Sequence, residues 1–363
     1  MALHKNRLGF GRGSVALLLL GVLLGGCAAV GPTTIARDRV DYLQSISESW
    51  KRQVLLNLVK LRYSEAPVFL DVASIISSYE LYGEMSAQAQ AAPQNRAGDS
   101  FLGIGAGGRF TDRPTITYSP LQGDKFARSL MTPLPVSGIL LLIQGGYPVD
   151  VVLQVSVNTI NGLPNATGGL FERAGAPQFF ELSRLLREAQ RDGDLGFETR
   201  ALAGRQNLTM SFRAPDAVSR KRIERIATLL GSRPDAREFS VSYGSFPESD
   251  RDIALQTRSM LQMLSNLAAT VEVPAQDVAE GRAYAIHREG DRGSEAPRRL
   301  TVRNGPEAPA DAYVAVRYRD RYFWIDDRDS GSKAMLSFVM LMFSLTESGA
   351  SAPAAPLITV PTR

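Results

Sequence analysis

The amino-acid sequence predicts an α+β fold, with antiparallel or mixed sheets and packed helices behind a removable N-terminal segment. Some stretches carry apolar residues three and four positions apart, which is typical of helices. Others are short and rich in alternating or β-branched residues, which is typical of strands. The two kinds are interspersed, and several strands follow one another closely enough to pair antiparallel. This mixture favours α+β over an all-helical or all-strand class.

The N-terminus has the order of a secretory signal. Lys5, Arg7 and Arg12 form a basic region, and the apolar run Val15–Leu24 follows. The run is too short for a helix that spans a bilayer, which needs about 20 residues. A basic region followed by a short apolar core and small residues is typical of a signal peptide that is removed.

The end of this signal carries the motif Leu24-Gly25-Gly26-Cys27. The motif resembles the lipobox of bacterial lipoproteins. The resemblance implies that residues 1–26 are a lipoprotein signal peptide and that Cys27 becomes the first residue, with diacylglycerol on its sulfur. Ala28, which is not aspartate, implies outer-membrane delivery by the enterobacterial sorting rule. We therefore expect a chain anchored by lipid in the outer membrane and facing the periplasm.

Composition limits the partners of the mature chain. Its 41 basic residues fall to 38 when Lys5, Arg7 and Arg12 leave with the signal, against 37 acidic residues. This near balance gives no reason to expect nucleic acid as a partner. Cys27 is the one cysteine in the sequence, so no disulfide can form within the chain. The mature length is sufficient to bury a large core.

Expected elements begin after residues 27–40, which we interpret as a lipidated tether. Apolar residues at helical spacing predict a helix over Asp41–Arg62. The composition of Val68–Met85 predicts strand structure, and the polar stretch Met85–Ser100 predicts a loop. Two strands are then expected to flank the turn Asp112-Arg113-Pro114. These strands cover Phe101–Phe110 and Thr115–Tyr118, and helices are expected over Leu121–Met131 and Val136–Gln144.

The second half of the chain alternates between strand and helix patterns. A buried strand is expected over Val149–Ile160, closed by Asn161-Gly162. Further expected helices are Gln178–Gln190, Asp216–Leu230, Asp252–Ala269 and Ser332–Leu345; expected strands are Leu208–Phe212, Glu238–Tyr243, Arg298–Arg303, Ala312–Tyr318 and Tyr322–Ile325. Residues 41–346 are thus the globular region, either one domain or two packed halves that meet near residues 162–169. The loop His287–Pro297 and the tail of residues 347–363 are expected to lack regular structure.

Histidine usage excludes many enzyme classes. The mature chain keeps only His287, so a zinc site built from His and Cys cannot form. A Ser-His-Asp triad would need His287, and its polar surroundings favour a solvated loop residue instead. We therefore predict no metal and no cofactor.

Ser330-Gly331-Ser332-Lys333 matches the S-x-x-K spacing of serine acyltransferases at an expected helix start. The companion K-T-G and S-D-N motifs are missing from the sequence, so a serine that caps the helix explains the match more simply. The acidic run Asp326–Asp329 could bind a hard cation, but acidic residues before a helix need no metal. Gly103–Gly108 has the glycines of a phosphate loop without the helix that such a loop requires.

Four stretches of the body are familiar as a group. They are Trp50–Asn57, Pro67–Val72, Lys125–Leu130 and Tyr322–Asp329. Together they resemble a family of uncharacterised proteobacterial lipoproteins. The resemblance agrees with the lipobox and implies no activity, cofactor or catalytic residue.

The sequence therefore favours a non-enzymatic structural or assembly component of an envelope complex, with the membrane and an envelope protein as partners. The tail stretch Leu357–Val360 could add a strand to such a partner. One alternative is an envelope hydrolase or transferase that uses Ser330 or Ser332 with Lys333. The other is a glycan- or lipid-binding lipoprotein, in which the aromatic residues of Tyr313–Trp324 would form stacking surfaces.

Overall fold

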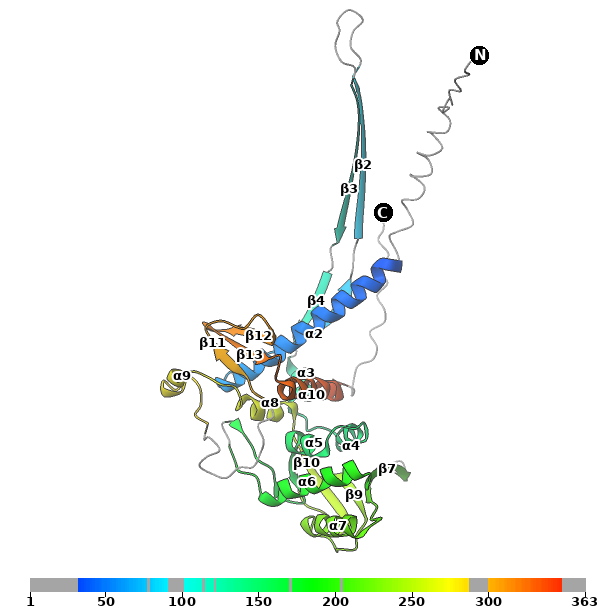
Figure 1. Cartoon of the computed structure of the whole chain (residues 1–363), viewed down its shortest axis with the longest axis vertical. Helices are drawn as coiled ribbons and strands as arrows, with labels where there is room; N and C mark the ends of the chain where they lie inside the picture. Colours follow the sequence, from blue (N-terminus) through cyan, green and yellow to red (C-terminus); the bar gives the residue numbers. More distant parts are fainter. Residues whose placement is uncertain are drawn as a thin grey trace, which may run out of the picture. The chain divides into compact units, whose positions relative to one another are not determined.

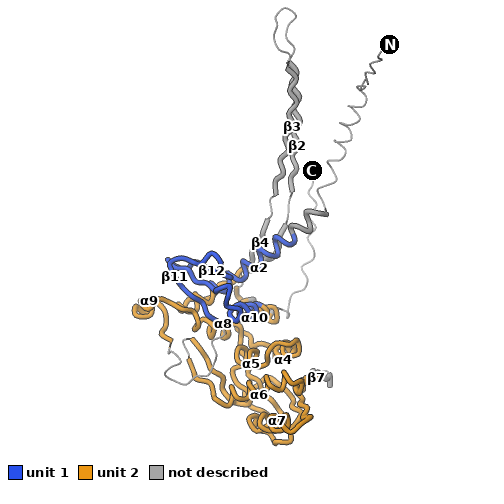
Figure 2. The backbone as a smooth tube through the Cα atoms, in the orientation of Figure 1, with its two compact units in different colours: residues 1–56, 299–340 blue, residues 57–298, 341–363 orange. Residues whose placement is uncertain are grey.

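A computed structural model describes residues 32–76, 79–90, 101–112, 115–120, 122–169, 172–202, 205–286 and 300–347. The signal peptide, Cys27, His287 and the tail stretch Leu357–Val360 lie outside these residues. The chain forms two compact units, residues 1–56 with 299–340 and residues 57–298 with 341–363 (Figure 2). The boundaries therefore do not fall near residues 162–169, where the sequence suggested two halves. Helices combine with a mixed sheet and antiparallel sheets, which confirms the α+β class.

The smaller unit contains one three-stranded sheet and parts of two helices. Strands β11 (Arg303–Gly305), β12 (Ala312–Tyr318) and β13 (Arg321–Asp326) pair antiparallel in the order β11-β13-β12. The second and third strands match the sequence prediction, whereas the first begins at Arg303 and was expected to end there. Val314, Phe323 and Ile325 alternate with more exposed residues and are buried, which gives the sheet its single core face.

The helices of this unit are the first part of α2 (Pro32–Arg62) and most of α10 (Ser330–Glu347). Their buried residues include Leu55, Leu336 and Val339. Residues 32–40 are helical, so the prediction of a tether without regular structure is wrong for them. Gly31-Pro32 suggested a break, but proline is tolerated in the first turn of a helix because its missing N–H has no partner there.

The larger unit is organised by a six-stranded mixed sheet. Its strands are β5 (Val157–Ile160), β6 (Leu163–Pro164), β7 (Leu195–Leu202), β8 (Arg205–Phe212), β9 (Glu238–Tyr243) and β10 (Asp252–Thr257), in the order β6-β5-β10-β9-β8-β7. Only β9 and β10 pair in parallel. The sheet packs with helices α4 (Val136–Gln144), α5 (Val149–Ser156), α6 (Pro177–Asp192) and α7 (Ala217–Leu229) (Figure 1).

Two segments of this unit differ from the sequence prediction. Val149–Ser156 is helical where a strand was expected, and only Val157–Ile160 is extended. Its many valines suggested a strand, but tertiary packing of the buried positions overrides this weak preference. Asp252–Thr257 is a strand where a helix was expected. The helix α8 begins later, at Met260, because Ser259 and Gln262 form a reciprocal capping box.

Short helices complete the larger unit. They are α3 (Gly123–Phe126), the π-helical turn η2 (Ala127–Met131), α8 (Met260–Ala268) and α9 (Ala275–Ala279). The first two confirm the helix expected before Pro133, and α9 was not predicted. None of the helices in the described ranges is both long enough and apolar enough to cross a bilayer.

Two antiparallel pairs of strands lie between α2 and α3 in the sequence. Strand β1 (Leu70–Ile76) pairs with β4 (Thr115–Pro120), and β2 (Tyr79–Gln90) pairs with β3 (Phe101–Asp112) over its whole length (Figure 1). The strands after residue 100 confirm the sequence prediction. The loop predicted for Met85–Ser100 is wrong for Met85–Gln90, which belongs to β2.

Candidate functional site

The S-x-x-K segment forms the start of α10, and its serine serves the helix cap. The Ser332 amide donates to Asp329 Oδ1 at 2.9 Å, and the Ser332 hydroxyl donates to Asp329 Oδ2 at 2.6 Å. The same hydroxyl accepts from the Thr301 amide at 2.8 Å. The hydrogen bonds from Ser332 lower the pKa of Asp329 below its usual value. Since Ser332 is buried, its hydroxyl is used structurally and is closed to a substrate.

Lys333 is held on a different group. Its ammonium lies 2.7 Å from Asp327 Oδ1 and donates to the Asp327 carbonyl at 3.0 Å. The ammonium also lies 5.1 Å from the centre of the Tyr313 ring, and Lys51 approaches the same ring at 4.6 Å. Within the described residues, no hydrogen bond joins Lys333 to Ser330 or Ser332. The geometry therefore does not assemble the serine–lysine pair that the hydrolase alternative requires.

The acidic run before α10 is divided among separate partners. Asp326 accepts from the Arg328 amide at 2.9 Å, Asp327 pairs with Lys333, and Asp329 caps the helix. Arg328 pairs with Asp311 at 2.8 Å. No group of three metal-ligating side chains occurs in the part of the chain that the structure describes. The arrangement accounts for these carboxylates without a cation.

The aromatic residues of β12 and β13 belong to packing. Phe323 is almost fully buried and meets Tyr318 edge to face, with ring centres 6.3 Å apart. Gly305 leaves room for Trp324, since a Cβ at that glycine would lie 3.1 Å from the indole ring. Tyr313 lies between Lys51 and Lys333. These contacts do not leave the aromatic set arranged as a platform for stacking a sugar.

Two buried arginines without carboxylate partners were missed by the sequence analysis. Arg258 donates to Asn158 Oδ1 at 2.9 Å and to the carbonyls of Gln154, Val155 and Ala166. Burial lowers the pKa of Arg258 to about 10. Two of the carbonyls close the C-terminal end of α5, where a cation is favourable. The side chain therefore ties the end of a helix to a loop, a structural role.

Arg62 resembles Arg258 in its surroundings. It is buried, donates to the carbonyls of Val271 and Tyr284, and lies 4.3 Å from the centre of the Tyr284 ring. Burial lowers its pKa from the usual value. Only the hydrogen-bond acceptors distinguish such a residue from a surface arginine, and these come from distant parts of the chain. Periodicity in the sequence could not have revealed them.

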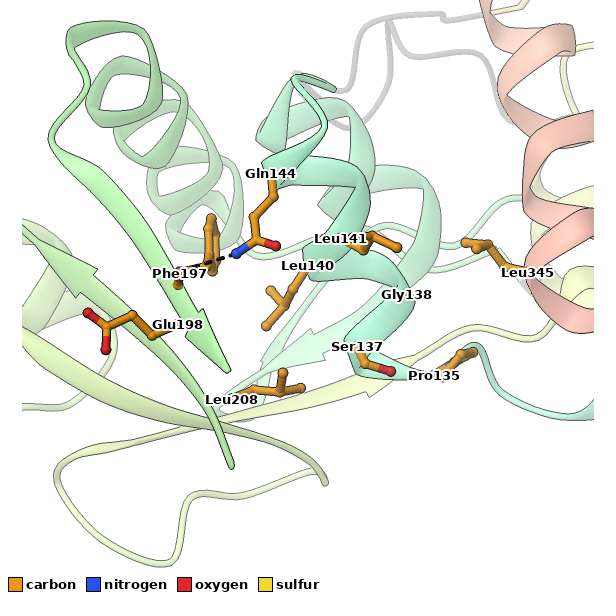
Figure 3. Close-up of a pocket in the computed structure, with 10 residues that line it drawn as sticks. All are labelled: Pro135, Ser137, Gly138, Leu140, Leu141, Gln144, Phe197, Glu198, Leu208 and Leu345. Carbon is orange, nitrogen blue, oxygen red and sulfur yellow. Dashed lines mark hydrogen bonds between the residues drawn. The ribbon is translucent and has the colours of Figure 1, made fainter. Parts of the chain in front are cut away.

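An apolar pocket lies between α4 and strands β7 and β8, with the end of α10 at its rim (Figure 3). Its volume is about 310 Å³, at the lower end of small-molecule sites. It is lined by Pro135, Ser137, Gly138, Leu140, Leu141, Gln144, Phe197, Glu198, Leu208 and Leu345. Gln144 donates to the Phe197 carbonyl at 3.2 Å, and Leu141 is 62% exposed. The polar side chains are few, so the pocket suits an apolar group.

The hairpin of β2 and β3 contains the glycine-rich run Gly103–Gly108. Twelve residues of each strand are paired, from Tyr79 with Asp112 to Gln90 with Phe101. The glycines therefore lie in a strand, and the next described element is also a strand. This excludes the phosphate-loop interpretation, which needs a helix N-terminus. Among the described residues, β2 and β3 pair only with each other, so each strand has an outer edge without a partner.

The register of this hairpin separates its residues into two sets. From Leu81 to Ala89 and from Leu102 to Phe110, one face receives only apolar residues and glycine: Leu81, Gly83, Met85, Ala87, Ala89, Leu102, Ile104, Ala106, Gly108 and Phe110. The other face receives the glutamates, glutamines, Ser86, Arg109 and three glycines of the same strands. Because side chains alternate between the faces of a sheet, the hairpin is amphipathic. Pairing the pattern of residues 79–90 with that of 101–112 could have revealed it.

Comparisons with protein-family models, with curated proteins and with solved structures give no match. The functional argument therefore depends on the residues and geometry of this chain.

Proposed function

We propose that this protein is a non-enzymatic, lipid-anchored structural or assembly component of a bacterial envelope complex. The proposed anchor is a diacylglycerol on Cys27, which holds the chain at the periplasmic face of the outer membrane. The observation that supports the assembly role most is the β2–β3 hairpin, which combines unpaired edges with one apolar face. An isolated two-stranded hairpin is only marginally stable in water, so this element needs a partner.

The edges of the hairpin lack the features that prevent association. Proteins protect edge strands with lysine, proline or short length. Neither Tyr79–Gln90 nor Phe101–Asp112 contains lysine or proline, and each is twelve residues long. The sequence and pairing therefore favour addition of further strands. The alternative of a serine hydrolase receives no support from α10, where Ser332 and Lys333 have separate partners.

The proposal is tested by gentle detergent purification of the tagged protein from its native membranes, with mass spectrometry of the recovered material. We expect stoichiometric partners or further copies with the wild type, a mature chain that begins at lipidated Cys27, and loss of both with Cys27→Ala. Met85→Glu should also reduce recovery because it places a charge on the apolar face. Its matched control is Ser86→Glu, one residue away on the other face. A lipidated wild type that is recovered alone and monomeric would contradict the assembly role.

The pocket beside α4 favours a second candidate, the binding of a small apolar ligand. Leu141 is 62% exposed at its rim, and a bound acyl chain would cover it. Medium-chain fatty acids should then raise the melting temperature of the wild type, because a ligand that binds only the folded state stabilises it. Leu141→Gln should reduce this effect, whereas Val218→Gln, an exposed position on α7, should not. Equal melting temperatures with and without fatty acid would eliminate this candidate.

A further inference from the structure

The apolar face of the β2–β3 hairpin has the length of a membrane-crossing strand pair. Leu81–Ala89 and Leu102–Phe110 each contain nine residues, and their ends are paired with each other in the register. At about 3.3 Å per residue this face extends for about 27 Å. A strand that crosses the hydrocarbon core needs about 9–11 residues. The apolar stretch therefore fits a bilayer core better than it fits a short contact with a protein.

The distribution of charge follows the same direction. The charged residues of the two strands are Glu80, Glu84, Arg109 and Asp112, which all lie in the half that is remote from the connection between the strands. From Met85 to Gln90 and from Phe101 to Gly108 neither face receives a charged residue. A charged side chain costs several kcal/mol in the bilayer centre. A charge-free end is what a segment that enters hydrocarbon requires.

The outer edges add a second requirement. Inside hydrocarbon, every backbone N–H and C=O must be paired within the protein, and both edges of this hairpin are unpaired among the described residues. An identical hairpin from another copy supplies a strand of the same length and the same alternation. Pairing with copies would therefore keep the apolar residues of all hairpins on one face. The polar and glycine-rich residues would share the other face.

We propose that the β2–β3 hairpins of several copies of this chain pair edge to edge and lay their apolar face against the acyl chains of the membrane. The inference rests on the proposed function for the presence of the chain at a membrane and names the partners of the assembly. The lipid on Cys27 brings the chain to the bilayer, and the hairpin then enters it. The partners are a second copy at each edge and hydrocarbon at the apolar face.

The experiment uses the full chain with Cys27→Ala, which removes the single cysteine of the sequence. Single cysteines are introduced at Leu81, Met85, Ala87 and Ala89, and at the matched positions Tyr82, Ser86, Gln88 and Gln90. Each is labelled with a fluorophore sensitive to polarity. The protein is reconstituted by detergent removal into vesicles of phosphatidylethanolamine and phosphatidylglycerol, with or without brominated acyl chains.

We expect blue-shifted emission and quenching by brominated lipid at the first set of positions, and neither at the second. The same emission across both sets would overturn the proposal, as would failure of the protein to join the vesicles. Alternating emission without quenching would show that protein covers the face, which also contradicts it. A monomer by light scattering after mild extraction would exclude edge pairing. The partner recovery of the lipidated wild type is measured separately, so the proposed function can fail or survive independently of these outcomes.

Discussion

Replacement of Arg258 by methionine tests how the larger unit is held together. The change keeps an unbranched side chain and removes the donors to the carbonyls of Gln154, Val155 and Ala166. A buried acceptor left without a donor costs about 1–3 kcal/mol. Removal of a desolvated charge offsets part of this loss, as does water reaching the two part-buried carbonyls. We therefore expect a loss of about 3 kcal/mol in the free energy of unfolding.

The assay is thermal and urea-induced unfolding followed by circular dichroism. A loss of about 3 kcal/mol corresponds to a melting temperature lower by about 6–12 °C for a unit of this size. Arg258→Lys should fall between wild type and Arg258→Met, because an ammonium can replace only some of the hydrogen bonds. The control is Arg225→Met. Arg225 makes two hydrogen bonds of 2.8 Å to Glu181 but is half exposed, so its midpoint should not change measurably. Equal midpoints for Arg258→Met and wild type would refute the reasoning.

Three further predictions concern side chains with assigned partners. Asn57 is buried and exchanges two 2.8 Å hydrogen bonds with the Val68 backbone, so Asn57→Ala should lower the free energy of unfolding by about 2 kcal/mol in urea titrations; an unchanged midpoint would contradict this. The pKa of Asp329 is lowered in the folded state by Ser332. Its stabilisation is therefore complete above the pKa of the unfolded chain and is lost as pH falls through the folded pKa. Ser332→Ala should weaken this acid dependence, and identical profiles would contradict the cap. Wild type and Lys333→Ala should both resist an activity-based serine probe, and labelling that depends on Lys333 would revive the hydrolase alternative.

Local signals predicted several elements well. Helix α4 follows Pro135 and ends before Gly145-Gly146, so both of its boundaries are marked in the sequence. The cap residue Asp216 likewise marks the start of α7, where its side chain accepts from the Ser219 amide at 2.8 Å. These features depend on contacts a few residues apart. A single sequence is sufficient to show them.

The misread segments depend on contacts that are distant in the sequence. Val149–Ser156 has a strand-like composition but packs as a helix beside α6. Asp252–Thr257 is extended because it is the central strand between β5 and β9. Met85–Gln90 consists of small and polar residues and becomes a strand through its register with β3. The composition of a segment does not specify its pairing partner, which is why the hairpin was not predicted.

The candidate site was predictable only in part. The sequence favoured a helix cap over catalysis at Ser330–Lys333, and the hydrogen bonds of Asp329 and Ser332 agree with a cap. The residue that caps α10 is nevertheless Asp329, one position before the predicted serines. The apolar pocket could not be predicted, because its walls come from α4, β7, β8 and α10. Cys27 lies outside the described residues, and its lipidation stays a prediction.

The central claim is that the β2–β3 hairpin gains strands at its edges when the protein is assembled. Hydrogen exchange of its backbone amides tests this most directly, because only alternate residues of a two-stranded antiparallel pair bond to each other. The wild type in native-like membranes should protect nearly all amides of Tyr79–Gln90 and Phe101–Asp112. Monomeric Cys27→Ala protein in solution should protect at most about half of them. Equal protection of about half the amides in both samples would contradict the account, because it would show that the edges stay open in the membrane.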